Sequence, residues 1–344
     1  MNAVPKTINK KILLESKHLE RCPFPVPIGW YFVDYSENLK PGELRNVFLL
    51  DQEWVLFRGE SGKVGLSDPY CAHLGAHMGH GGKVCGDHLR CPFHHWEYDT
   101  EGWCKKVPYG KTQPPITKLQ PVVRMLPVVE KYGMIWCWYH PELEPPAWEL
   151  PHIPELEDAG WEGKRRGTWT ANTCIQEIAE NGVDVAHLKF LHGAPIIPPV
   201  EATYEGPKMI LNIGQGYIVG HTYGPGLNVM RFTQMNPATQ KPVTATMISY
   251  TVPITREKSQ MNMCFRHKDY AEGTSELAFS KKMIDHMIGA AEGEESAGFE
   301  SVDFIVWNNK KYRARPLLCD GDGPIIQFRQ WFRQFYVGAN LEAI

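Results

Sequence analysis

The sequence predicts an α+β protein with two domains, on three observations. Residues 29–140 form a series of short apolar or alternating runs separated by turn residues, which is typical of an all-β domain. A proline-rich stretch, 140–161, follows and has the composition of a linker. Beyond it, strand-like runs lie among helical patterns, which indicates a sheet with flanking helices. We therefore expect an N-terminal segment (1–27), an all-β domain (28–140) and an α+β domain (141–344).

Composition and charge exclude several classes of protein. The chain has 344 residues, 43% of them hydrophobic and 22% charged, which predicts an ordinary globular core. A net charge of -3 gives no basic field, so we expect no nucleic-acid partner. The first 20 residues lack the apolar core of a secretory signal, and the most apolar run, 132–139, is too short for a transmembrane segment. Nine cysteines, an odd number, indicate reduced thiols and a cytoplasmic location.

The predicted elements follow in chain order. In the first half, strands are expected over 44–50, 54–59, 63–68 and 133–139. In the second half, we expect a helix over 174–193, strands over 208–221, 227–236, 243–252 and 260–266, and helices over 275–290 and 294–312. A final helix is expected to start near Pro324, with Ile325, Phe328, Phe332 and Phe335 on one stripe.

The stretch from Cys71 to Asp99 contains three cysteines and six histidines, which points to a metal site. The pairs Cys71-x-His73 and Cys91-x-x-His94 are separated by 17 residues. Zinc sites usually open with two cysteines and end with two histidines, whereas each pair here has one of each. Two thiolates for one iron and two imidazoles for the other are what a Rieske [2Fe–2S] cluster needs. A zinc site and incidental surface histidines are the alternatives.

This stretch resembles the Rieske motif, which is C-x-H, then about 15 to 17 residues, then C-x-x-H. Glycines in the loops would let backbone N–H groups approach the cluster sulfurs. The remaining histidines do not fit the motif and are expected at the surface or behind the ligands, and Cys85 has no evident partner. The glycines are Gly75, Gly79, Gly81 and Gly82, and the histidines are His77, His80, His88 and His95.

One departure from the motif distinguishes between subtypes. Rieske proteins of respiratory complexes resemble C-T-H-L-G-C and C-P-C-H, and their extra cysteines form a disulfide. Here Ala76 and Phe93 stand in those places, so that disulfide cannot form. The resemblance is therefore to Rieske domains of oxygenases and ferredoxins, with an expected potential of roughly -150 mV.

A second cluster of polar residues lies in the segment "ENGVDVAHLKFLHG". Asp184 and His187 are three residues apart and share a helix face. His187 and His192 are five apart, about 140° around an ideal helix. They can bind one metal only if the helix is distorted or ends between them, and Gly193 stands in the position of a helix stop. The alternative is a helix with two ordinary histidines.

A carboxylate further along the chain favours the metal. Phe299, Val302 and Val306 recur at helical spacing, and Asp303 sits beside them on the same apolar stripe. A buried carboxylate costs several kcal/mol unless something neutralises it. A salt bridge is one explanation for Asp303, and a bound metal is the other.

His187, His192 and Asp303 would form the 2-His-1-carboxylate triad of non-haem Fe(II), with open positions for O2. Asp285 and Glu300 are rival carboxylates on neighbouring helical patterns. Glu300 also adjoins the apolar stripe, but Asp303 better matches the Rieske oxygenases that the chain resembles.

Nearly the whole chain resembles the α-subunits of Rieske non-haem iron oxygenases. The resemblance implies an N-terminal all-β Rieske [2Fe–2S] domain and a helix-grip (Bet v1/START-like) catalytic domain with an antiparallel sheet and flanking helices. The family pattern D-x-x-H-x(4)-H falls on Asp184, His187 and His192, and Asn181 is a further catalytic candidate. Asp184 would bridge the ligand His94 of one subunit to His187 of its neighbour, which implies a ring of subunits, usually a homotrimer.

Two stretches carry a more specific resemblance. Residues 175–192 are similar to the iron-binding segment of cholesterol 7-desaturases, and residues 307–336 are similar to the C-terminus of those enzymes and of 3-ketosteroid 9α-hydroxylases. This implies an oxygenase that hydroxylates or desaturates a sterol or 3-ketosteroid. Flexible apolar side chains in the strand region suit such a ligand, and simple core packing is the alternative. They are Met209, Met230, Met247, Met261 and Met263.

Electrons for such a reaction come from NAD(P)H. The sequence has neither a G-x-G-x-x-G after a strand nor the plant-type ferredoxin spacing, so a separate ferredoxin reductase or flavin/iron–sulfur reductase is implied. An aromatic-ring hydroxylating oxygenase is the alternative enzyme. A Rieske electron-transfer protein without oxygenase activity is the alternative from a different class.

Overall fold

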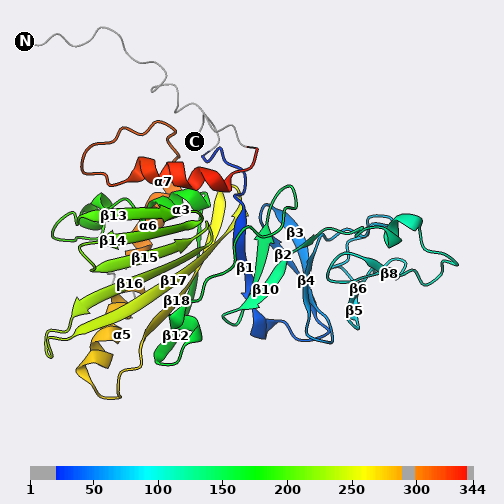
Figure 1. Cartoon of the computed structure of the whole chain (residues 1–344), viewed down its shortest axis with the longest axis horizontal. Coiled ribbons are helices and arrows are strands. Elements are labelled where there is room, and N and C mark those ends of the chain that lie inside the picture. Colours follow the sequence, from blue (N-terminus) through cyan, green and yellow to red (C-terminus); the bar gives the residue numbers. More distant parts are fainter. Residues whose placement is uncertain (1–20, 289–298, 339–344) are drawn as a thin grey trace, which may run out of the picture.

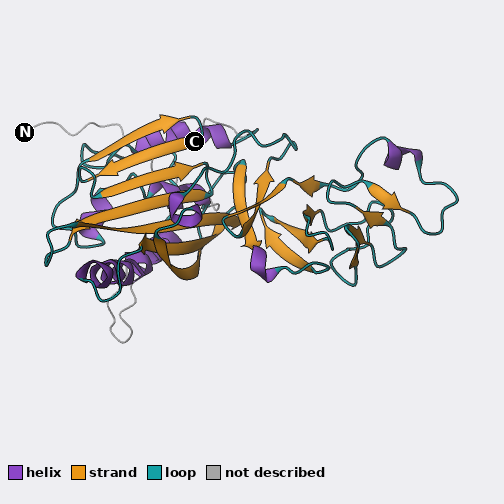
Figure 2. Ribbon diagram, turned by 60° about the horizontal axis from the view of Figure 1, so that its bottom comes forward, coloured by secondary structure: helices purple, strands orange, loops and turns teal. Residues whose placement is uncertain are grey.

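The structure is a computed structural model of the whole chain, and residues 21–288 and 299–338 are described. The molecule is elongated, with a large sheet at one end and a small sheet, β5–β8, at the other (Figure 1). The two views agree on this arrangement (Figure 2). Within the described ranges, no helix combines the length and the apolar character needed to cross a bilayer.

The first half is built from three small antiparallel sheets. Their hydrogen-bonded orders are β1-β11-β10, β2-β3-β4-β9 and β5-β6-β7-β8. The strands predicted over 44–50, 54–59, 63–68 and 133–139 are confirmed as β2, β3, β4 and β11. The bounds are β1 (Gly29–Tyr35), β2 (Leu44–Leu49), β3 (Gln52–Arg58), β4 (Val64–Ser67), β5 (Lys83–Cys85), β6 (His88–Arg90), β7 (Glu97–Tyr98), β8 (Cys104–Lys106), β9 (Met125–Leu126), β10 (Val128–Lys131) and β11 (Met134–Tyr139), with short helices η2 (Ser36–Asn38) and η3 (Pro115–Lys118).

The second half is one seven-stranded antiparallel sheet with helices packed along it, in the order β12-β18-β17-β16-β15-β14-β13. The α+β class with an antiparallel sheet and flanking helices is confirmed. The strands are β12 (Trp161–Ala171), β13 (Val200–Glu205), β14 (Lys208–Ile213), β15 (Ile218–Tyr223), β16 (Leu227–Met235), β17 (Pro242–Thr255) and β18 (Lys258–Lys268). The helices are α2 (Pro154–Glu157), α3 (Ile175–Glu180), α4 (Ala186–Phe190), α5 (Ser275–Ile288), α6 (Phe299–Asn309), α7 (Ile325–Phe332) and η4 (Arg333–Phe335).

Two predicted elements are each divided in the structure. The run 208–221, predicted as one strand, is β14 and β15 joined by a turn in which Gly214 and Gly216 have φ of 64° and 96°. The helix predicted over 174–193 is the pair α3 and α4 with a turn between them. The final helix is confirmed, and Phe328, Phe332 and Phe335 on its stripe are fully buried.

The prediction that Val306 and Asp303 share one buried stripe of α6 is wrong. Val306 is 43% exposed, whereas Asp303 and Trp307 are 4% and 6% exposed. The buried face of α6 therefore contains Asp303 and Trp307, which are four residues apart, together with Phe304, which packs in the same core. The side chains of Phe299 and Val302, and residues 289–298, lie outside the described part of the chain.

Candidate metal centres

The first candidate centre lies in two loops. One connects β4 to the small sheet β5–β8, and the other connects β6 to β7 within that sheet. Cys71 follows β4, and Cys91 comes directly after β6. Each loop folds back on its cysteine: Cys71 N donates to Ala76 O at 3.0 Å, Gly75 N donates to Cys71 O at 2.9 Å, and Cys91 N donates to Trp96 O at 2.8 Å. Gly75 takes φ of 72°, which favours glycine at this turn.

The structure brings the four predicted side chains together as two pairs. Cys71 and Cys91 are 3% and 1% exposed, and burial, followed by the neighbouring Cys71 thiol, raises the pKa of Cys91. The rings of His73 and His94 have centroids 4.9 Å apart. The Nδ1 atom of His94 is buried and has no hydrogen-bond partner among the described residues. Two adjacent thiols and two adjacent imidazoles, one with an unpartnered nitrogen, fit the donor set of a [2Fe–2S] cluster.

Aromatic residues that no sequence motif indicated surround these four side chains. The His73 ring stacks on Trp96 with centroids 4.6 Å apart and planes 4° apart. Trp96 Nε1 donates to Tyr109 Oη at 3.0 Å, and Tyr109 Oη lies 3.5 Å from His73 Nε2. Tyr98 Oη lies 3.1 Å from Cys71 Sγ. These contacts fix the ring of His73 and provide a hydrogen bond beside a ligand sulfur.

The other histidines of this stretch have different neighbours. His77 Nε2 lies 3.6 Å from Glu53 Oε2, and His88 Nδ1 lies 3.4 Å from Glu97 Oε2. His80 and His95 are exposed. Two of the glycines have a steric reason that does not involve a cluster. A Cβ atom on Gly79 would lie 1.6 Å from Asn46 Oδ1, and one on Gly82 would lie 1.9 Å from Met78 O.

The second candidate centre depends on the end of α4. His187 lies in α4, the helix ends at Phe190, and His192 lies beyond the C-cap residue Leu191. Gly193 follows with φ of 73°, the left-handed conformation that ends helices. The chain therefore turns between the two histidines, which is one of the two conditions that their five-residue spacing requires.

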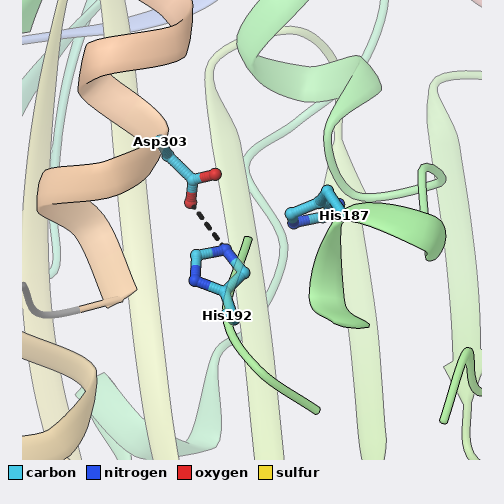
Figure 3. Close-up of side chains that lie close together, drawn as sticks. All are labelled: His187, His192 and Asp303. Carbon is cyan, nitrogen blue, oxygen red and sulfur yellow. Dashed lines mark ion pairs between the residues drawn. The ribbon is translucent and has the colours of Figure 1, made fainter. Parts of the chain in front are cut away.

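His187, His192 and Asp303 come together, with one ligand atom from each lying within 4.8 Å of the others. Figure 3 shows Asp303 pointing from α6 toward His192, and their Oδ2 and Nε2 atoms are 3.3 Å apart. The rings of His187 and His192 have centroids 5.1 Å apart. Asp285 is exposed on α5 and is not part of this cluster, and the side chain of Glu300 lies outside the described residues.

Asn181 and Asp184 contact these residues from the turn between α3 and α4. Asn181 Nδ2 lies 3.3 Å from His187 Nε2 and donates to Asp303 Oδ1 at 3.3 Å. The backbone N of His187 donates to Asp184 Oδ1 at 3.4 Å, and its Nδ1 contacts Asp184 O. Burial lowers the pKa of His187, although Asp303 and Asp184 oppose it, which favours the neutral imidazole that binds metals. Two imidazoles and one buried carboxylate fit a non-haem Fe(II) site.

A cavity of about 990 Å³, counting the space at its open mouth, adjoins this cluster. Asn181, Asp184, His187 and Asp303 line it, and His192 is not among its lining residues. Four of the five methionines considered above also line it, whereas Met209 is buried in the core. The remaining lining is mostly apolar and includes Phe232, Phe304 and Trp307, with four polar side chains at Thr222, Asn228, Ser249 and Thr251.

Comparisons with known proteins match each half of the chain to a known domain. Residues 29–122 match the Rieske [2Fe-2S] domain, and residues 137–336 match the 3-Ketosteroid 9alpha-hydroxylase C-terminal domain. A cholesterol 7-desaturase of Caenorhabditis elegans is 33% identical over 343 residues, which cover 90% of this chain and 77% of the relative. A probable 3-ketosteroid-9-alpha-monooxygenase, oxygenase component, of Rhodococcus rhodochrous is 27% identical over 336 residues, 90% of this chain and 79% of the relative.

Among solved structures, dicamba monooxygenase bound to dicamba has the same fold, with a TM-score of 0.65, 18% identity and coverage of 91% of this chain and 96% of that one. The fold and the two clusters define the class, which is that of Rieske-type non-haem iron oxygenases. Within that class, the chain belongs to the family with the 3-ketosteroid 9α-hydroxylase C-terminal domain. It is an oxidoreductase that uses a Rieske [2Fe–2S] cluster, non-haem iron and O2. Electron transfer alone would not account for the second domain.

Proposed function

We propose that this enzyme hydroxylates or desaturates a sterol or a 3-ketosteroid. The observation that carries the proposal is the mostly apolar cavity next to His187 and Asp303. The four fused rings of a steroid carry few polar groups, so binding depends on burying apolar surface. Such burial contributes about 25 cal/mol of binding free energy per Å². Methionines that line the cavity adapt to such a shape because their side chains are flexible. The named activities of the cholesterol 7-desaturase and 3-ketosteroid monooxygenase relatives support the same substrate class.

The proposal assigns a role to each of the site residues. Cys71, His73, Cys91 and His94 would hold the [2Fe–2S] cluster, and His187, His192 and Asp303 would hold the mononuclear iron. Bound there, the two groups supply electrons and O2 activation. Asn181 would orient His187 and Asp303 through its amide. The apolar wall would keep water from the reacting carbon and select the C–H bond by position.

Partners and organisation belong to the same proposal. A separate reductase would supply electrons from NAD(P)H, as the name "oxygenase component" indicates for a relative. We propose a homotrimer in which Asp184 bridges to His94 of a neighbouring subunit. We also propose a Rieske domain over 28–140 and a catalytic domain over 141–344, supported by the separate sheets of the two halves. A cytoplasmic location stays a prediction from the sequence.

A substrate panel tests the activity. The enzyme, a surrogate reductase and NADH are incubated with sterols, 3-ketosteroids, bile acids and small arenes. We expect O2 consumption that depends on a steroid and is coupled to a product with one added oxygen atom or two fewer hydrogen atoms. Turnover of a small arene to a cis-diol, with no turnover of any steroid, would identify an aromatic-ring hydroxylating oxygenase instead.

The iron-ligand assignment has its own test. Asp303→Asn should lose the mononuclear iron because the buried carboxylate contributes the negative charge of the site. The Rieske EPR signal and acid-labile sulfide should stay unchanged. Asp285→Asn is the matched control, since Asp285 is the exposed rival carboxylate on α5. Retention of a full complement of iron by Asp303→Asn would refute the assignment.

A further inference from the structure

Helix α3 buries three polar side chains within six residues. Gln176, Glu177 and Glu180 are 0%, 1% and 6% exposed, and none of them lines the cavity or contacts the cluster of His187. Charged groups are seldom fully buried unless they are paired. The concentration of such groups on one short helix therefore needs an explanation beyond the metal ligands.

Each of these side chains is paired with the part of the chain that follows α6. Glu177 Oε2 lies 2.6 Å from Lys310 Nζ. Glu180 accepts two hydrogen bonds from Arg329, from Nε at 2.6 Å and from Nη2 at 2.8 Å. Tyr336 Oη donates to Gln176 Oε1 at 2.9 Å. These contacts span between 133 and 160 residues of sequence, so they join α3 to the C-terminal segment that closes the fold.

The C-terminal side of this network is itself fixed. Arg329 Nη1 donates to Arg313 O at 2.6 Å, and the guanidinium lies 4.4 Å from the Tyr312 ring centroid. Lys310 N donates to Val306 O at 2.8 Å, so Lys310 continues directly from the last turn of α6. Lys310 and Arg329 therefore belong to segments that are held in place by α6 and α7.

The same segments carry the two halves of the mononuclear iron site. Glu180 immediately precedes Asn181, which leads to His187 and His192, while Lys310 lies two helical turns beyond Asp303. The carboxylate and the histidines come from segments more than a hundred residues apart, so contacts between α3 and the end of α6 set their separation. The Glu177–Lys310 pair is a direct contact of this kind.

Stability alone is a weak explanation for these pairs. Replacing a buried ion pair by apolar residues of similar volume is often neutral or stabilising, because desolvation offsets the attraction. A bidentate arginine does, however, fix the position of the carboxylate that it binds. The Glu177–Lys310 ion pair adds a direct contact between α3 and the residue that follows α6.

We propose that the Glu177–Lys310 and Glu180–Arg329 ion pairs are positioning devices for the mononuclear iron site. They hold α3 against the ends of α6 and α7 and so set the distance between the histidines and Asp303. The inference rests on the proposed ligand assignment.

The test measures iron binding rather than turnover. In Glu177→Gln, Lys310 can turn to water because 35% of its side chain is already exposed, so the variant is expected to fold. We expect Fe(II) to bind the emptied mononuclear site about 10- to 100-fold more weakly than in the wild type, a loss similar to that seen when a hydrogen-bond partner of a metal ligand is removed. Acid-labile sulfide and the Rieske EPR signal should be unchanged. Lys310→Met should show the same loss, and Lys310→Arg should restore binding.

A second buried pair provides the control. Glu155 and Arg231 are 2.5 Å apart, with side chains 1% and 24% exposed, which resembles the 1% and 35% of Glu177 and Lys310. Arg231 lies on β16 between the cavity-lining Met230 and Phe232 and so points to the opposite face of the sheet. Glu155→Gln should lower the thermal midpoint and leave Fe(II) affinity unchanged.

The outcomes separate the two proposals. Fe(II) affinity unchanged in both Glu177→Gln and Lys310→Met would overturn the positioning role, and so would an equal loss in Glu155→Gln. If Lys310→Met does not fold, Glu177→Gln together with Lys310→Arg decides the question. Absence of a mononuclear Fe(II) site in the wild type would instead overturn the ligand assignment.

Discussion

At the scale of single residues, Asn181 connects the two halves of the second cluster. Its amide lies 3.3 Å from both a nitrogen of His187 and an oxygen of Asp303. Asn181→Leu keeps a similar size but removes both contacts, so we expect about 10- to 100-fold weaker Fe(II) binding. Dialysis against a chelator, followed by the iron-to-sulfide ratio, measures it. Asn228→Leu is the control, because Asn228 lines the same cavity but bonds Thr222 instead. Equal iron retention by the two variants would contradict the role.

A second prediction at this scale concerns pH. The Arg58 guanidinium holds the pKa of Glu130 below its ordinary value, since it donates to both carboxylate oxygens, at 2.6 and 2.9 Å. Because the pKa of Glu130 is lower in the folded protein than its ordinary value of 4.5, the ion pair stabilises the fold fully above that pH. This stabilisation is lost as pH falls through the pKa of Glu130 in the folded state. Glu130→Gln should therefore lower the thermal midpoint at pH 7, and the difference from wild type should shrink as pH falls below 4.5 and disappear below the folded-state pKa of Glu130. A difference that stays constant across this range would show that the ion pair is not its cause.

The side chains that come together at the two candidate centres could be predicted from the sequence because residue type and spacing carry the chemistry. Cys and His at fixed intervals, and His187 with His192 before a glycine, are local patterns. The aromatic residues near the first cluster could not be predicted in the same way. Tyr109 lies 36 residues from His73, and nothing in the intervening sequence indicates that they meet. For Trp96, the sequence offered one indication of a place beside the cluster, which is that it follows His94 by two residues.

At the scale of elements, the two strands of the large sheet that were not predicted are its two edges, β12 and β13. Edge strands often carry charged and polar residues, which weaken the apolar signal of a strand even where the residues alternate. β12 reads "WEGKRRGTWTA", with consecutive basic residues and two glycines. β13 is half-buried at every second position and fully buried at none. Interior strands such as β17, buried on both faces over much of their length, were predicted because apolar residues recur at period two on each face.

The turn that separates α3 from α4 depends on a distant glycine. Gly323 has φ of 73°, and a Cβ atom there would lie 2.3 Å from Val183 O. Gly323→Ala should therefore shift the turn and lower the thermal midpoint of the protein. Gly273→Ala is the matched control, because Gly273 has φ of 77° and no atom within 4 Å of the added Cβ. Gly273→Ala should lower the free energy of unfolding by only about 1–2 kcal/mol, because a Cβ atom is unfavourable in the left-handed backbone conformation. Equal shifts in calorimetry would mean that the contact with Val183 is unimportant.

At the scale of the whole molecule, the two candidate centres are carried by opposite ends of an elongated chain. The first depends on loops beside β4 and β6, and the second on α4 and α6, which belong to the half of the chain that forms the large sheet (Figure 1). Leu74 and Phe93, next to the ligand histidines, are 65% and 61% exposed. In the proposed ring, a neighbouring copy covers this surface and places its own second centre beside the first centre of this one. This arrangement supports the proposed ring of subunits.

Mixing variant subunits tests whether the two centres work across subunits. We expect a particle of about three times 39.2 kDa by sedimentation. His94→Ala subunits would lack an intact first centre, and His187→Ala subunits would lack the second, so each homotrimer should be inactive. Mixed rings should regain activity, because the intact first centre of a His187→Ala subunit can face the intact second centre of a His94→Ala subunit.

Asp184→Asn provides the internal control for this experiment. Asp184 and His187 belong to the same segment, and Asp184 Oδ1 accepts a hydrogen bond from His187 N. A mixture of Asp184→Asn and His187→Ala subunits should therefore stay inactive, since every second centre in it carries one of the two changes. Activity in that mixture would show that Asp184 is not the bridge. Failure of the His94→Ala and His187→Ala mixture to regain activity, with mixed trimers verified by mass, would show that each subunit works alone.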